Sequence, residues 1–92
     1  MDIKSLISEG EQVKQRNTKQ GVVGQFVTGE EYERWIAKCV IYLQRSNYNS
    51  EMTNRFIEVS KKATGNGVEH FDTMMGILKA FDELGEEEII TF

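Results

Sequence analysis

One run of residues restricts the fold more than any other: residues 28–45, which begin Thr-Gly-Glu-Glu and continue as an amphipathic pattern. Its apolar positions recur every three or four residues, as on one face of a helix. They are Tyr32, Trp35, Ile36, Cys39, Val40 and Leu43. The opening tetrapeptide has the spacing of a capping box, in which the threonine and the second glutamate satisfy each other's backbone amides. We therefore expect a helix over 29–45 that forms the centre of the core.

The chain is too short to form a second hydrophobic core. A chain of 92 residues buries too little surface to divide between two cores. The sequence contains no proline, so long helices are permitted, and its single cysteine excludes an internal disulfide. We expect one domain over 1–92, held together by packing alone.

Three further helices are predicted from apolar spacing and from residues typical of helix ends. The first covers 2–19 with Asp2 as its N-cap, and the second covers 50–63 with Asn49 or Ser50 as its cap. The third covers 67–84, where Asn66 and Glu69 repeat the cap spacing and Gly85 ends the helix. The fold class is therefore all-α, a compact bundle of about four helices.

Two segments do not fit a helix. The valine-containing stretch 22–27 is expected to be a short extended segment whose Val22, Val23, Phe26 and Val27 tuck against the bundle. The tail 86–92 carries three glutamates where a helix C-terminus disfavours them, followed by residues that favour strands. We expect this tail to be strand-like and to pair with 22–27, with a partner chain or with a following segment. Its contact residues would be Ile89, Ile90 and Phe92.

No arrangement of residues in the sequence indicates catalysis. The glycines at 21 and 24 lack the residues that complete a phosphate-binding loop. His70 is the only histidine, and its acidic neighbours are adjacent in sequence, which does not give the spacing of metal ligands on a helix. Cys39 lies on the apolar face of its helix and is expected to be an inert, buried thiol. We predict a protein that is not an enzyme, with no cofactor and no metal.

Charge and hydropathy limit the partners. A net charge of −4 opposes general attraction to phosphate backbones, so nucleic acid is an unlikely partner. An alternative function, a small nucleotide- or nucleic-acid-binding protein, would need a basic helix surface. Its residues would be Lys14, Arg16, Arg34 and Arg45. No apolar run is long enough to span a membrane and the start lacks the order of a signal peptide, so we expect a cytoplasmic protein.

Three stretches resemble a helical N-terminal module of uncharacterised prokaryotic proteins, many of them linked to phage defence. They are "SLISEGEQV" at 5–13, "FVTGEEYERWIAKCVIYLQR" at 26–45 and "MMGILKAFDEL" at 74–84. The resemblance covers most of the chain, and in that family the module usually precedes a further domain. It implies an adaptor or self-association module that positions an effector or sensor, and it carries over no catalytic residue. The positions that correspond to the family's structural pattern are Leu6, Ile7, Trp35, Cys39, Leu43, Gly76, Ile77 and Leu78.

The expected function is therefore a non-enzymatic protein–protein interaction or self-association module. Its partner would be another protein or a second copy of the chain. Gly76 is a candidate contact beside the tail residues, because a glycine inside a helix costs about 1 kcal/mol relative to alanine. We expect another helix to pack closely at this position.

Overall fold

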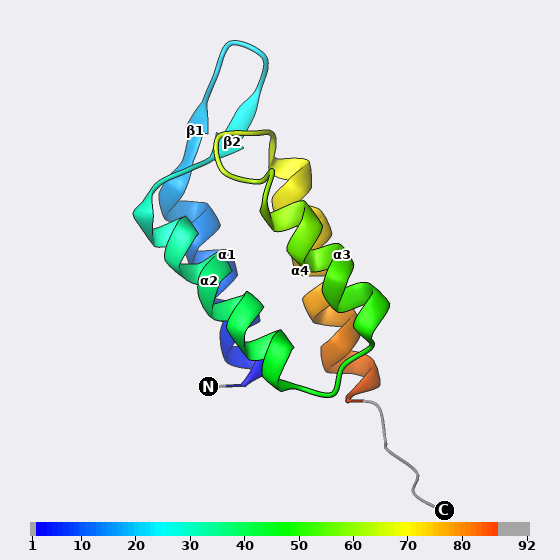
Figure 1. The fold of residues 1–92 in the computed structure, drawn as a ribbon. Coiled ribbons are helices and arrows are strands. Elements are labelled where there is room, and N and C mark those ends of the chain that lie inside the picture. Colours follow the sequence, from blue (N-terminus) through cyan, green and yellow to red (C-terminus); the bar gives the residue numbers. More distant parts are fainter. Residues whose placement is uncertain (1, 87–92) are drawn as a thin grey trace, which may run out of the picture.

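The computed structural model describes residues 2–86. The helices within them run alternately toward and away from one end of the molecule (Figure 1). They are α1 (Ile3–Asn17), α2 (Glu30–Arg45), α3 (Ser50–Ser60) and α4 (Val68–Leu84). Helix α1 contacts both α2 and α4, and α3 contacts the same two helices. The predicted all-α bundle of four helices is confirmed, and none of the helices in 2–86 has the length and apolar character that a membrane span needs.

The core is built around Trp35, as the apolar pattern predicted. Its ring is fully buried, and its indole N–H donates a hydrogen bond of 2.8 Å to the backbone carbonyl of Leu6 on α1. The rings of Tyr32 and Phe71 lie 6.1 and 5.5 Å from that of Trp35, centroid to centroid, so α2 and α4 meet through aromatic contacts. Aliphatic side chains of α1 and α4 belong to the same core, to which α3 adds the fully buried Phe56.

A two-stranded hairpin joins α1 to α2 and extends beyond the helices at one end of the bundle (Figure 1). Strand β1 (Thr18–Gln20) pairs antiparallel with β2 (Gln25–Val27). The predicted extended segment at 22–27 is therefore correct only for its second half, since 22–24 form the turn. The helix expected over 2–19 runs one residue too far at its start and two residues too far at its end. It ends at Asn17 because Thr18 turns to extended backbone and donates its hydroxyl to the Lys14 carbonyl at 2.6 Å.

Several predicted helix ends are confirmed by hydrogen bonds. The Asp2 carboxylate accepts from the Ser5 backbone N–H at 2.8 Å, and the Asn49 side chain accepts from that of Met52 at 3.0 Å. Gly85, with a φ of 77°, ends α4 and donates to the Phe81 carbonyl at 2.8 Å. Helix α3 ends at Ser60 and not at 63 as predicted, because a series of turns covers residues 61–65.

Both predicted capping boxes are wrong. The N-cap of α2 is Gly29, whose φ of 114° favours glycine, and the Glu31 carboxylate bonds to α1 instead of to its own helix. The N-cap of α4 is Gly67, without a side-chain cap, and the Asn66 amide donates back to the Lys62 carbonyl. In each case the side chain that the local pattern assigned to the cap makes a different hydrogen bond, to another helix or within a turn.

The close approach of helices expected at Gly76 occurs at a different glycine. A Cβ added at Gly76 would meet nothing within 4 Å, whereas one at Gly10 would lie 2.5 Å from Cζ2 of Trp35 and 2.7 Å from Cε of Met75. Gly10 is therefore the position that lets α1 lie against α2 and α4. Within residues 2–86, no helix packs closely on Gly76.

Candidate interaction surface

The hairpin is fixed to the loop between α3 and α4, which makes β2 the middle of three segments. On one edge β2 pairs with β1, and on the other Phe26 forms an antiparallel bridge with Gly67. The Gly65 backbone N–H also donates to the Val27 carbonyl at 3.0 Å. Segments that are about forty residues apart in sequence thus meet at this end of the bundle.

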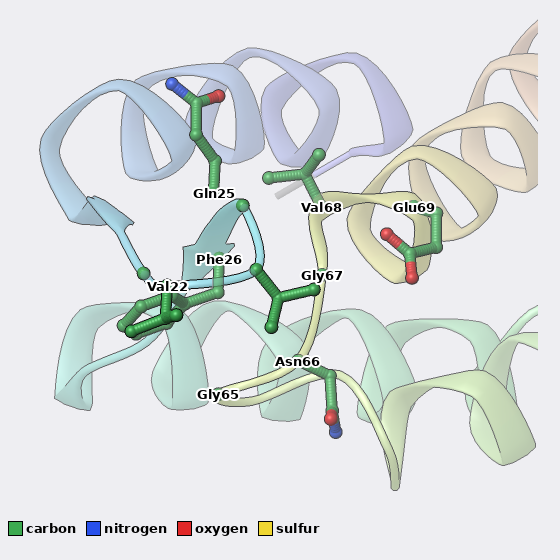
Figure 2. Close-up of a pocket in the computed structure, with 11 residues that line it drawn as sticks. Val22, Gln25, Phe26, Gly65, Asn66, Gly67, Val68 and Glu69 are labelled. Atoms are coloured by element: carbon green, nitrogen blue, oxygen red, sulfur yellow. The ribbon is translucent and has the colours of Figure 1, made fainter.

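These segments enclose an open groove of about 650 Å³ (Figure 2). One wall is the hairpin turn and β2, residues 21–26, and the other is residues 65–69, which lead into α4. The Phe26 ring packs under the turn, because a Cβ at Gly21 would be 3.1 Å from its Cε1. We define the hairpin tip, residues 21–25, together with this groove as the tip surface.

The most exposed apolar side chains of the described chain lie at the hairpin tip. Val22 and Val23 have relative accessibilities of 106% and 101%, as open as in an extended peptide. The prediction that these two valines tuck against the bundle is therefore wrong, whereas Val27 is buried and Phe26 half-buried as expected. The valines project because the Gly21 N–H donates to the Gly24 carbonyl at 2.8 Å and closes the turn between them.

The charge around the tip is low. Residues 21–25 carry no charged side chain, and the nearest charges in sequence are Lys19 on β1 and Glu30 at the start of α2. Across the groove, Glu69 is the single charged residue of the opposite wall. The tip surface thus combines two exposed valines with a mixed polar and apolar groove, and it carries little charge on a protein whose net charge is −4.

A polar cluster at the base of the hairpin holds it in place. The Glu31 carboxylate accepts two hydrogen bonds from the Arg16 guanidinium, at 3.0 and 2.9 Å, and one from the Asn17 amide at 2.6 Å. These bonds keep the pKa of Glu31 below its usual range. The Thr28 backbone N–H adds a bond to the Asn17 carbonyl at 3.3 Å, so the two ends of the hairpin are tied together. We call Arg16, Asn17 and Glu31 the hairpin clasp.

The cations proposed for an alternative basic surface do not form one patch. Arg16 belongs to the hairpin clasp, and Arg34 pairs with Glu30 one helical turn away. Lys14 lies 3.5 Å from the Asp72 carboxylate and above the Phe71 ring. Arg45 is at the far end of α2 from the hairpin (Figure 1). This arrangement gives nucleic acid no continuous strip of unpaired cations along these four residues.

The two residues considered for chemistry occupy separate environments. Cys39 is fully buried, and burial raises the pKa of its thiol well above the ordinary range, so it is protonated at neutral pH. His70 is half-buried, with its Nδ1 3.4 Å from the Gly67 carbonyl oxygen. Within residues 2–86, no three histidine, cysteine, aspartate or glutamate side chains gather as a metal site would require.

The sequence analysis did not point to the tip surface. The tail residues Ile89, Ile90 and Phe92 lie outside the described residues. The tip valines were assigned to the core because they are apolar, although the Gly-x-x-Gly flanks are a turn signal. Searches of family models, curated proteins and solved structures find no match to this chain.

Proposed function

We propose that this protein is a non-enzymatic self-association module and that the tip surface is its contact. The single observation that carries the proposal is the pair of fully exposed valines at the tip of a hairpin whose base is bonded to α1 and α2 through the clasp. Exposed aliphatic side chains at a projecting position lose water favourably when a partner covers them.

The tip surface contains both a projecting part and a groove, so two copies can fit each other through the same surface. The projecting Val22 and Val23 and the groove that could receive them belong to the same end of the molecule. A twofold axis near this end would place the valines of each copy in the groove of the other, as an isologous interface requires. Two copies with a net charge of −4 each repel one another. Electrostatic repulsion is weakest where they meet through the hairpin tip, because residues 21–25 carry no charge.

The association is expected to be weak. Stable complexes bury roughly 1,200–2,000 Å² of total surface, and the hairpin tip with one groove wall offers much less than a whole bundle face. A module of this kind gains strength when a second contact in the same assembly raises the effective concentration of the first. The family resemblance is consistent with this role, because it places such a module before a further domain in prokaryotic, often phage-defence, proteins. A cytoplasmic location, expected from the sequence, belongs to the same proposal.

Sedimentation equilibrium of the 92-residue chain over a wide concentration range tests the proposal. The wild type should show an average mass that rises with concentration, and V22S/V23S should remain monomeric. L84S is the matched control, because Leu84 is also an exposed aliphatic residue, with 84% accessibility, but lies at the opposite end of α4 from the hairpin. It should associate like the wild type.

Two results would contradict the proposal. The first is a wild type that stays monomeric at the highest concentration reached. The second is an association that V22S/V23S leaves unchanged. Circular dichroism of each variant separates loss of association from loss of folding, and the valines contribute little to folding because they are exposed.

A further inference from the structure

The hairpin has one closed edge and one open edge. Strand β2 is paired on both sides, with β1 on one and, through the bridge from Phe26 to Gly67, with the loop before α4 on the other. Within residues 2–86, strand β1 pairs with β2 alone. It lies on the outer side of the hairpin, away from that loop (Figure 1). We call the unpaired side of residues 18–20 the β1 edge.

The hydrogen bonds of the hairpin determine which backbone groups the β1 edge presents. Two of them fix the alternation of the ladder, one at the tip and one at the base: Gly21 N–H to the Gly24 carbonyl and Thr28 N–H to the Asn17 carbonyl. Hydrogen-bonded pairs alternate along an antiparallel ladder, so the backbone groups of Lys19 also face β2. Those of Thr18 and Gln20 therefore point away from β2, onto the β1 edge.

Three of these outward groups have no partner among residues 2–86. The Thr18 N–H is used, because it donates to the Lys14 carbonyl at the end of α1. The Thr18 carbonyl, the Gln20 N–H and the Gln20 carbonyl are left. An extended backbone lying antiparallel to β1 fits this pattern. One of its residues would exchange both N–H···O bonds with Gln20, and the residue two positions later would donate to Thr18.

Lys19 determines the charge of the residue that would lie between those two. It is exposed and forms no ion pair with another residue of the described range. The added residue opposite it would belong to a non-hydrogen-bonded pair, in which side chains lie closest. A carboxylate there attracts the Lys19 ammonium, and a cation repels it. A second copy of the chain fits less well, because it brings its own Lys19 to an edge of three residues.

We propose that the β1 edge binds an extended acidic segment of another protein, which adds to β1 as an antiparallel strand. A lysine on a short edge strand is a device by which proteins prevent unspecific pairing. Here the same lysine makes the pairing selective for a segment with a carboxylate at the matching position. The contact is separate from the tip surface and does not depend on self-association.

A titration of the isotope-labelled full chain with a peptide, followed by nuclear magnetic resonance, tests the proposal. The probe is acetyl-Thr-Val-Thr-Glu-Thr-Val-Thr-amide, whose glutamate would lie opposite Lys19. The Gln20 amide should shift downfield to a saturating value and exchange with solvent several-fold more slowly. N-methylation of the third peptide residue removes an N–H that faces β1 and should weaken binding several-fold. The matched control is N-methylation of the glutamate, whose N–H faces away, and it should weaken binding much less.

A reversal of charge tests the role of Lys19. K19E should weaken binding of the glutamate peptide several-fold, and it should improve binding of a peptide with lysine in place of the glutamate. K62E is the matched control, because Lys62 is another exposed lysine without an ion pair in the described chain, and it lies in the turns after α3. It changes the net charge equally and should bind the glutamate peptide as the wild type does.

Each other outcome overturns the proposal. A Gln20 amide that does not shift, equal effects of the two N-methylations, or a K19E variant that binds like K62E would each exclude the pairing. A Gln20 amide that is already protected without peptide would show that the β1 edge is covered in the free protein. Shifts confined to 21–26 and 65–69 would place the peptide in the groove of the tip surface. V22S/V23S should bind the peptide like the wild type, whether or not it has lost self-association.

Discussion

At the scale of the residue, two glycines inside helices have opposite roles. Both Gly10 and Gly76 interrupt good helix formers, and intrinsic propensity alone treats them alike. Their surroundings distinguish them: Gly10 is buried against Trp35 and Met75, and Gly76 is exposed. The sequence could not reveal this difference, because it depends on which helix lies across each glycine.

The two alanine variants should therefore shift stability in opposite directions. G76A should stabilise the fold by about 1 kcal/mol, because a methyl group there gains helix propensity and meets no atom. G10A places a methyl group 2.5 Å from the indole of Trp35 and should destabilise by about 1–3 kcal/mol, the usual cost of overpacking. Urea unfolding followed by circular dichroism measures both. A stabilising G10A would show that α1 can move away from the tryptophan without cost.

At the scale of the element, the helices could be predicted and the hairpin could not. The apolar stripes of all four helices gave their positions to within three residues, because packing follows the same period as the helix. The hairpin depends on pairing between 18–20 and 25–27, and the polar β1 sequence Thr-Lys-Gln has no pattern that separates it from the end of α1. Local sequence patterns do not predict the bridge from Phe26 to Gly67, because it joins β2 to the loop before α4, about forty residues later.

The hairpin clasp is an element-scale contact that a paired substitution can isolate. E31A removes the acceptor of Arg16 and Asn17, whereas E30A removes only a partner of Arg34 on the same helix. We expect E31A, and not E30A, to speed hydrogen exchange at the Thr28 and Gly21 amides, which bond within the hairpin and its base. Equal protection in both variants would show that the clasp does not hold the hairpin.

The same clasp should respond to pH. The pKa of Glu31 is lowered in the folded protein, so its contribution is fully present above the ordinary glutamate pKa. That contribution is lost as the pH falls through the lowered value, because the protonated carboxyl no longer pairs with Arg16. The difference in exchange between E31A and the wild type should therefore be largest near neutral pH and disappear in acid.

At the scale of the whole molecule, the bundle separates two surfaces by the length of its helices. The tip surface lies at one end. A second groove lies toward the other end, where α1 begins and α4 ends (Figure 1), and it is lined by Lys38, Ile41, Tyr42, Arg45 and Ser46. A contact that used the tip of one copy and the far end of the next would be heterologous and would extend into a filament. A contact from tip to tip is isologous and stops at two copies.

The proposed interface therefore predicts a closed dimer. The mass seen in sedimentation should level off at twice that of the chain, because once two tips are joined no further tip surface is free. With oxidised glutathione as the oxidant, V23C should form a disulfide-linked dimer, since the proposed contact would bring residue 23 of the two copies together. L84C, at the other end, should not do so at the same concentration. An average mass that continues past the dimer, or efficient linking through L84C, would instead indicate head-to-tail growth, and the valines would then require a partner surface outside the tip.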